Sequence, residues 1–541
     1  MLTQIAFILA IVVLVVVVGK ISHRVGLPDA ALLTVAGMVY GFLPGPNIRL
    51  DPELVLDVVL PPLLYVAALG SSLLALRSRM RTVVSLSVLL VLATALAVGG
   101  LLSWLVPVIP LAAAIALGAA AAPPDPVAAL SIGRRAGLPA KLTTLIEGEG
   151  LLNDATALTT FQVALVAAVG GGFSLGSAVG QFFLAAFGGL IVGIVVALVV
   201  RLSRRVLTDP LSANAISLAT PFAAYTVGEA MHVSGVLAVV ITGLLVGYQS
   251  PKLQTGESRL QTGAVWRLIN YLLEGLVFLL IGQQLPAVLV GLTAYPVPTI
   301  VLASGITVGV VLLLRPLWLY GTQHFPRWLH SRLGGESSSP DDRPLNGKEI
   351  FALSWAGTRG VITLAAAFAI PRTLADGQPF PGRDLLLFCA YVVVLVTLLG
   401  QGLTFGPLLR RLRLPVNIYD EARLRNEARV AAADAALGRL DQLVEEDGLN
   451  EKTADDIRQV LLRRHRRYRS RLDFLEDNPD ALRSPEYHAA AAARRAVIDA
   501  QHEEFLRWRD AGRLPDSSLR ILQRELDHEE RTLPSPPPNF A

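Results

Sequence analysis

Residues 119–127 read Ala-Ala-Ala-Ala-Pro-Pro-Asp-Pro-Val and close a long apolar run. Three prolines within four residues cannot belong to an intact helix, because they remove backbone donors and leave carbonyls without partners. In hydrocarbon, such carbonyls must line a cavity or bind something. Asp125 lies in the middle of this break, and carbonyl and carboxylate oxygens together suit a hard cation. A simple proline kink does not need the charge, so we expect a broken membrane helix at a cation site.

Hydrophobic residues make up 53% of the 541 residues, and the charged 17% are unevenly distributed. Residues 1–415 hold 44 of the 90 Asp, Glu, Lys and Arg, whereas the much shorter remainder holds 46. This division excludes one soluble globular domain, and the single cysteine, Cys389, excludes a disulfide scaffold. The composition predicts an all-α polytopic membrane domain at residues 1–411 and a helical cytoplasmic tail at residues 412–541.

Apolar runs long enough to cross a bilayer recur throughout the membrane domain. We expect about thirteen of them, roughly at residues 3–19, 27–43, 54–70, 83–104, 109–130, 143–169, 177–200, 212–230, 234–249, 266–285, 298–321, 349–370 and 384–408. Cytoplasmic loops are enriched in Lys and Arg, and 21 of these lie in one alternate set of connections against three in the other. This bias predicts an N-terminus outside the plasma membrane and a cytoplasmic C-terminus. It also accounts for the basic composition without nucleic-acid binding.

The twelfth expected span contains a second weak point, Ser354-Trp-Ala-Gly-Thr-Arg359-Gly360. Two glycines flank an intramembrane arginine there, and glycine lowers the stability of a helix. If the first six and the last six spans form two units, this span corresponds to the fifth, which carries the proline break. Such units run in opposite directions across the membrane, as in transporters whose broken helices meet at the midplane. We therefore expect inverted six-helix repeats with two broken helices.

The sixth span carries three acids within eight residues, Glu147, Glu149 and Asp154. Ionisable groups in membrane spans are costly and usually face a cavity or a partner. At about 100° per residue, Glu149 and Asp154 lie about 140° apart and are expected to have different partners. Gly150, one turn before Asp154, leaves room for an ion or water. Glu147 lies nearer the cytoplasmic end, where simple solvation is the favoured interpretation.

Arg359 needs a carboxylate at membrane depth, and Glu149 is the preferred candidate, followed by Glu274 and Glu229. The pair is expected to position the break rather than to bind a transported ion. Deleting one member would leave the other charge buried and unpaired.

The remaining ionisable residues in the spans are expected either to form structural pairs or to be exposed to water. Structural pairing is the default interpretation for Asp57 and Arg315, and it is also favoured for Glu274. Glu229 and His232 lie at the outer end of their span, where a lone histidine is more often a surface group than a proton relay.

These residues resemble the cation:proton antiporter-1 family, which includes the bacterial NhaP proteins and the animal sodium/proton exchangers. The resemblance covers residues 1 to about 411. It rests on several motifs in the same order: Leu60-Pro61-Pro62-Leu63-Leu64, Asp125-Pro126-Val127-Ala128, Glu149-Gly-Leu-Leu-Asn153-Asp154, Ser234-Gly235-Val236-Leu237-Ala238, Glu274 with Phe278-Leu279, and Gly357-Thr358-Arg359-Gly360.

The resemblance implies a six-helix core and a dimerisation domain, usually in a homodimer embedded in the lipid bilayer. It implies that Asp154 is the shared site of the proton and the sodium ion, and that Asn153 marks one-for-one, electroneutral exchange. It matches Asp125 to the family's broken-helix Asp, and it matches Glu149 and Arg359 to a structural ion pair.

The sequence departs from the family at three positions. Val66 replaces an acid that some members have, Pro124 replaces a Thr before the broken-helix Asp, and Gly150 replaces a Ser one turn before the key Asp. Two possible ligands and one helper are therefore missing. Asp154 remains, so proton-coupled transport is still expected, with sodium as the favoured ion and lithium or potassium as alternatives.

The sequence therefore predicts a transporter rather than an enzyme, with no cofactor, that exchanges a monovalent cation for a proton by alternating access. Asp154 would hold one or the other, and Asp125 would order a water or the Asn153 amide in preference to direct ligation. The alternatives are a cation channel and a sensor that signals through the tail, whose ligand the sequence does not identify. In the tail, the cluster Arg463, Arg464, Arg466 and Arg467 is interpreted as a solvated helix face rather than a lipid-binding patch.

Overall fold

The computed structural model describes residues 2–43, 52–170, 175–207, 209–332, 345–374, 376–414, 418–446, 449–477, 485–511, 513–531 and 533. Regular structure in these ranges is helical, apart from one isolated bridge between Thr373 and Pro379. Contacts divide the chain into two compact units, Met1–Val416 and Asn417–Ala541. The second unit contains α20 (Ile418–Glu446), α21 (Glu451–Asp477), α22 (Pro485–Asp510) and α23 (Asp516–Arg531).

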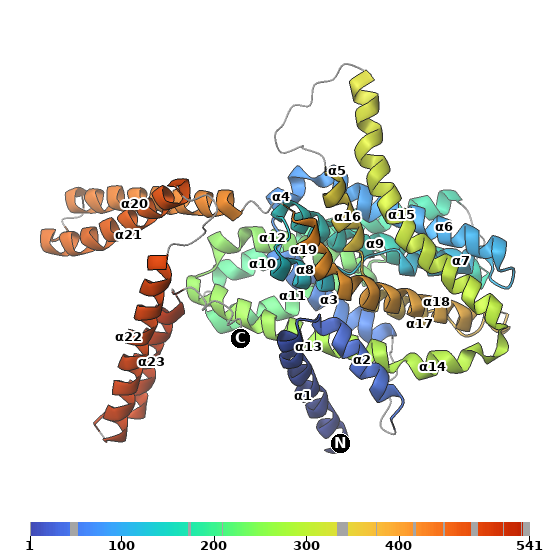
Figure 1. Cartoon of the computed structure of the whole chain (residues 1–541), viewed down its shortest axis with the longest axis horizontal. Coiled ribbons are helices and arrows are strands. Elements are labelled where there is room, and N and C mark those ends of the chain that lie inside the picture. Colours follow the sequence, from blue (N-terminus) through green and yellow to red (C-terminus); the bar gives the residue numbers. More distant parts are fainter. Residues whose placement is uncertain are drawn as a thin grey trace. The chain divides into compact units, whose positions relative to one another are not determined.

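The first unit contains the helices from α1 to α19 (Figure 1). Its first part comprises α1 (Leu2–Val25), α2 (Asp29–Gly41), η1 (Leu54–Val59), α3 (Leu60–Gly70), α4 (Leu73–Ser78), α5 (Met80–Val84), η2 (Ser85–Leu89), α6 (Leu90–Leu105), α7 (Leu111–Ala121), α8 (Pro126–Ala136) and α9 (Ala140–Val169). Its second part comprises α10 (Leu175–Val206), α11 (Pro210–Ala230), α12 (Gly235–Leu253), α13 (Gly256–Gln283), α14 (Leu285–Val290), η3 (Gly291–Ala294), α15 (Val297–Arg332), α16 (Gly347–Trp355), α17 (Val361–Phe368), α18 (Arg383–Leu395), η5 (Val396–Gln401) and α19 (Gly402–Leu412).

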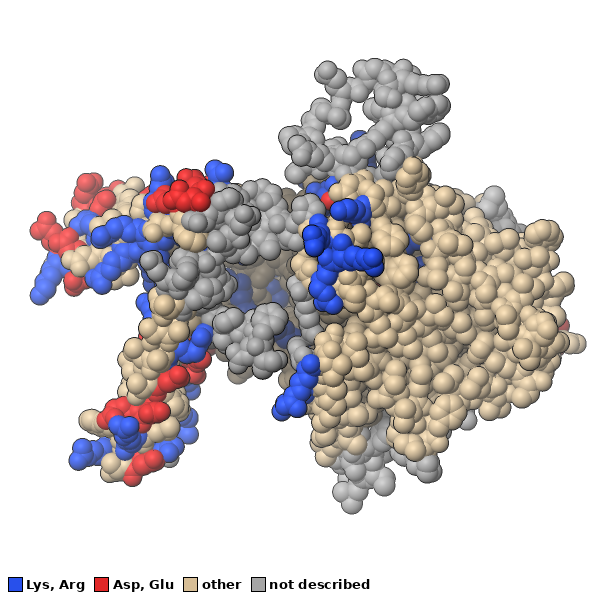
Figure 2. Space-filling view, in the orientation of Figure 1, with Lys and Arg blue, Asp and Glu red and all other residues tan. Residues whose placement is uncertain are grey.

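The surface of the first unit is that of a membrane protein. Eight helices of the described chain are long and apolar enough to cross a bilayer, and three shorter apolar helices accompany them. Large side chains on α10 and α15, such as Leu184, Ile191, Leu313 and Leu317, are exposed. Figure 2 shows a face of this unit with few charges, whereas the tail helices carry both signs. Helical structure lies over each expected span, and the exact number of crossings and the repeat relation stay predictions.

Both expected helix breaks are present. Residues 122–125 separate α7 from α8, and residues 356–360 separate α16 from α17. Asp125 is the N-cap of α8, because its carboxylate accepts a hydrogen bond of 2.9 Å from the backbone nitrogen of Val127. The cap satisfies one of the donors that the first turn of a helix leaves free.

α9 is the helix on which the two broken helices converge. It contacts α7 and α8, which precede it in the chain, and α16 and α17, which follow it. In Figure 1, α8, α9 and α16 lie near one another. It is 30 residues long, or about 45 Å, which suffices to span a bilayer. Side chains in the middle of α9 are therefore within reach of both breaks.

Small residues allow α2 and α13 to pack with their backbones in contact. A Cβ atom added at Gly37 would lie 2.1 Å from the carbonyl oxygen of Leu279. One added at Gly282 would lie 2.0 Å from that of Thr34. Membrane helices associate through such close backbone approach, because lipid supplies no hydrophobic driving force between them.

We expect Gly282→Ala to destabilise the first unit by roughly 1–3 kcal/mol, because the added methyl group must be accommodated by backbone shifts. Gly305→Ala in α15 is the matched control, since a Cβ atom there meets nothing within 4 Å. Thermal unfolding midpoints in detergent measure both variants. Equal midpoints would contradict the described packing of α2 against α13.

Candidate functional site

The two helix breaks are joined to each other by two hydrogen bonds. The backbone nitrogen of Asp125 donates to the carbonyl oxygen of Thr358 at 2.6 Å. The hydroxyl of Thr358 donates in return to the carbonyl oxygen of Asp125 at 3.1 Å. Backbone groups in a membrane need internal partners, so each break satisfies groups that the other exposes.

Arg359 closes the end of α7 with its guanidinium group. The side chain is 3% exposed. It donates from Nε to the carbonyl oxygen of Ala121 and from Nη2 to that of Ala122, both at 3.1 Å, and from Nη1 to that of Gly357. These are carbonyls that a helix C-terminus leaves without intrahelical partners, where a positive charge is favourable.

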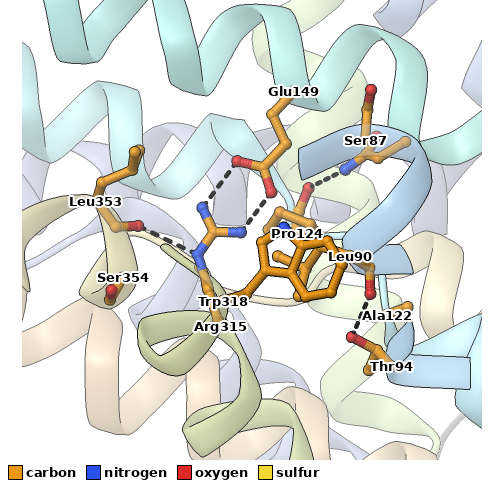
Figure 3. A network of polar contacts seen from close by, with 12 residues as sticks. Ser87, Leu90, Thr94, Ala122, Pro124, Glu149, Arg315, Trp318, Leu353 and Ser354 are labelled. Carbon is orange, nitrogen blue, oxygen red and sulfur yellow. Dashed lines mark hydrogen bonds and ion pairs between the residues drawn. The ribbon is translucent and has the colours of Figure 1, made fainter. Parts of the chain in front are cut away.

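The predicted ion pair between Glu149 and Arg359 is wrong. Glu149 instead pairs with Arg315 of α15 through both carboxylate oxygens, with Nη2 to Oε2 at 2.8 Å (Figure 3). The two side chains are 1% and 3% exposed, and Nε of Arg315 also donates to the carbonyl oxygen of Leu353 at 3.2 Å. The structural pairing expected for Arg315 is confirmed. The error has a physical cause: carbonyl oxygens can hold Arg359, so that arginine needs no carboxylate.

Asn153 ties α9 to the proline break. Its Nδ2 atom donates to the carbonyl oxygen of Pro124 at 2.9 Å. The amide therefore binds the carbonyl that the prolines free, whereas the sequence left open whether Asp125 orders this amide or a water. Pro124 thus supplies a backbone acceptor to the residue next to Asp154.

Asp154 opens onto a cavity of about 420 Å³. Four acids line this cavity, Asp125, Glu147, Asp154 and Glu274, and within its described lining there is no Lys, Arg or His. The other lining residues are mostly apolar side chains of α3, α8, α13 and α17. Carboxylates in low-dielectric surroundings attract cations, so the arrangement suits a cation.

The cavity separates the predicted site residues into two sets. Asp125, Pro124, Gly150 and Asp154 line it, whereas the bidentate pair of Glu149 lies outside its lining. Asp154 and Glu149 thus have different surroundings, as their angular separation on α9 predicted. A Cβ atom at Gly150 would lie 2.5 Å from the Pro126 ring, so that ring occupies the space where an ion or water was expected.

The other charged residues singled out in the sequence have mixed fates. Asp57 accepts a hydrogen bond of 2.8 Å from the Tyr225 hydroxyl, and Glu229 accepts one of 3.2 Å from the backbone nitrogen of Gly235. Glu274 lines the cavity, which its expected structural role did not anticipate. No group of three His, Cys, Asp or Glu among the described residues is arranged to hold a resident metal ion.

We expect Glu149→Gln and Arg315→Gln each to cost roughly 3–5 kcal/mol of stability, because each leaves an uncompensated buried charge. The double variant should lose clearly less than the sum of the two single losses. Unfolding in detergent measures all three. Arg359→Gln is the control, and it should show much weaker coupling to Glu149→Gln. Additive losses for the Glu149–Arg315 pair would contradict the contact.

Gly360→Ala should also disrupt the site, because a Cβ atom at this position would lie 2.0 Å from Oδ2 of Asp125. The carboxylate or the second break must then move, at a cost of roughly 1–3 kcal/mol. The unfolding midpoint measures this loss. Gly400→Ala in η5 meets nothing within 4 Å and serves as the control, and equal midpoints would contradict the close approach.

Comparisons with known proteins place the chain among ion transporters. It is 33% identical to an uncharacterized Na⁺/H⁺ exchanger of Mycobacterium tuberculosis, over 98% of this chain and 96% of that relative. It is 34% identical to a sodium, potassium, lithium and rubidium/H⁺ antiporter of Bacillus subtilis, over 66% of this chain and 54% of the relative.

A similar solved structure and a matching family profile point to the same class of protein as these relatives. The structure is similar to that of the sodium proton antiporter MjNhaP1 from Methanocaldococcus jannaschii, with a TM-score of 0.58, 19% identity, and coverage of 75% of this chain and 98% of that one. The sequence profile of a family described as sodium/hydrogen exchanger, transmembrane, matches residues 9–411. The resemblance inferred from the motifs is confirmed: the chain belongs to the sodium/hydrogen exchanger family, whose members are antiporters.

Proposed function

We propose that this protein exchanges a monovalent cation for a proton across the plasma membrane, in the service of pH and sodium homeostasis. The observation that carries the proposal is the position of Asp154. This carboxylate is 4% exposed and opens onto a cavity that contains three further acids and, in its described lining, no basic side chain. Ionisable groups in a membrane interior commonly mark ion pathways.

The exchange rests on competition at one carboxylate. Asp154 holds either a proton or a cation, and the arrival of one displaces the other. Its neighbour Asn153 is neutral and engaged with the Pro124 carbonyl, so it adds no second titrating group. One monovalent cation then replaces one proton, which makes the exchange electroneutral and indifferent to the membrane potential. Asp125 is the second candidate ligand, because it lines the same cavity.

Alternating access follows from the two sides of the cavity. One side consists of α9 with the joined breaks, and the other consists of α3 and α13. We infer that the first belongs to a moving core of inverted repeats and the second to a dimerisation domain of a homodimer. Movement of one side against the other exposes Asp154 to the two faces of the membrane in turn.

Sodium is the proposed ion, with lithium and potassium as alternatives. The relative from Bacillus subtilis is named for four alkali cations, which supports an alkali ion but does not select one. The loop charges support an external N-terminus and a cytoplasmic tail. We propose a regulatory role for that tail, whose α20–α21 pair is held in part by Arg458 and Asp441 at 2.8 Å.

The experiment is proton flux in proteoliposomes after addition of Na⁺, Li⁺ or K⁺, with the membrane potential clamped at several values. We expect saturable flux for at least one cation, the same at every potential, and loss of that flux to background in Asp154→Asn. Asp57→Asn is the control, since Asp57 is outside the cavity and bonds to Tyr225.

Three outcomes would contradict the proposal. Flux that persists in Asp154→Asn would show that the site is wrongly assigned. Cation flux that does not saturate and needs no proton would indicate a channel. A folded protein that moves no protons with any of the three ions would favour a sensor that acts through the tail.

A further inference from the structure

Glu274 is an acid that the proposed exchange does not use. It lies in the second half of α13 and lines the same cavity as Asp154. Its carboxylate accepts a hydrogen bond from Nδ2 of Asn270, one turn earlier, and Asn270 also lines the cavity. Among the salt bridges of the described chain, none includes Glu274. Burying an ionisable group at such a depth without a basic partner costs free energy, and residues of this kind in membrane proteins commonly serve a function.

Glu274 reaches the cavity from a different helix than Asp154 and Asp125 do. α13 contributes Glu274, whereas α9 and the joined breaks contribute Asp154 and Asp125. α13 also contacts α17, the helix that follows the second break. Asp125, Asp154 and Glu274 all line this one cavity. A cation in the cavity is therefore attracted by acids from separate helices.

Thr363 supplies an independent sign of a ligand. Its side chain is 1% exposed, its Oγ1 atom has no hydrogen-bond partner among the described residues, and it lines the cavity. Buried helical threonines usually donate to a carbonyl of the preceding turn. Thr94 and Thr307 do so here, at 2.7 and 2.8 Å.

The position of Thr363 on α17 brings it near the first break. Thr363 lies in the first turn of α17, three residues after its N-cap Gly360, and a Cβ atom added at Gly360 would clash with the Asp125 carboxylate. A hydroxyl without a hydrogen-bond partner among the described residues thus lines the same cavity as the Asp125 carboxylate. Hydroxyl and carboxylate oxygens are the ligands that hard cations prefer.

We propose that Glu274 and Thr363 form, beside Asp125, a second binding station for the monovalent cation, separate from the exchange carboxylate of Asp154. This inference rests on the proposed function and adds a step to it. The station replaces part of the hydration shell with protein oxygens before the cation reaches Asp154. Asn270 is a positioning residue, because its amide fixes one carboxylate oxygen of Glu274 and leaves the other for the ion.

The first test measures transport in proteoliposomes with Na⁺ as the probe. Glu274→Gln should raise the KM for Na⁺ about tenfold, which corresponds to about 1.4 kcal/mol, and it should change the maximal rate less than the KM. Thr363→Val should raise the KM about threefold, whereas Thr363→Ser, which keeps the hydroxyl, should have the KM of the unchanged protein. The matched controls are Thr94→Val, whose hydroxyl is already engaged, and Asp57→Asn, an acid outside the cavity.

The second test measures binding of radioactive Na⁺ to the purified protein and does not depend on transport. Asp154→Asn should bind Na⁺ more weakly but measurably, and Asp154→Asn combined with Glu274→Gln should lose this binding. An unchanged KM in Glu274→Gln, or an Asp154→Asn protein without residual binding, would overturn the station. If Glu274→Gln does not fold, Thr363→Val decides in both assays, and values equal to those of Thr94→Val would overturn the proposal. Flux that persists in Asp154→Asn would contradict the proposed exchange but not the second station, because the station is tested by Na⁺ binding rather than by flux.

Discussion

The need to satisfy backbone groups inside a membrane controls the centre of this structure. Two helices are interrupted at residues 122–125 and 356–360. The hydrocarbon core of a membrane offers no hydrogen-bond partners to the backbone groups that these interruptions free. They are satisfied by each other, through Asp125 and Thr358, and by Arg359, which binds the last carbonyls of α7. The position of the Asp125 carboxylate, and hence the composition of the cavity, follows from this mutual satisfaction.

The two buried arginines perform different tasks. Arg315 neutralises Glu149 in a bidentate pair, the geometry in which guanidinium and carboxylate bind most strongly. Arg359 instead donates hydrogen bonds to backbone carbonyl oxygens. Glu149 is thereby neutralised outside the cavity lining, while the acids that line the cavity keep their attraction for cations.

The sequence carries enough information for the breaks, the family and the key acids, because prolines and charges in apolar runs have few physical explanations. Asp154 and Asp125 could be identified in this way, and both line the cavity. The partner of Glu149 could not, because two arginines were available and only tertiary geometry separates a carboxylate partner from a set of carbonyls. Thr363 gives no sequence signal at all, since what distinguishes it is that its hydroxyl has no hydrogen-bond partner within the described part of the chain. Glu274 offered one signal, its depth in the span, which also fits a structural acid.

The joined breaks have a mechanical consequence. Because α7–α8 and α16–α17 are bonded to each other across their interruptions, and Asn153 bonds α9 to the first of them, these segments form one stiff body. The opposite lining is largely apolar, with side chains such as Leu63, Val66 and Phe278. Apolar surfaces can slide past each other without breaking directional bonds. The speed of any change in access to Asp154 is then set by side-chain packing and by the surrounding lipid, so bilayer thickness and fluidity become kinetic variables of the protein.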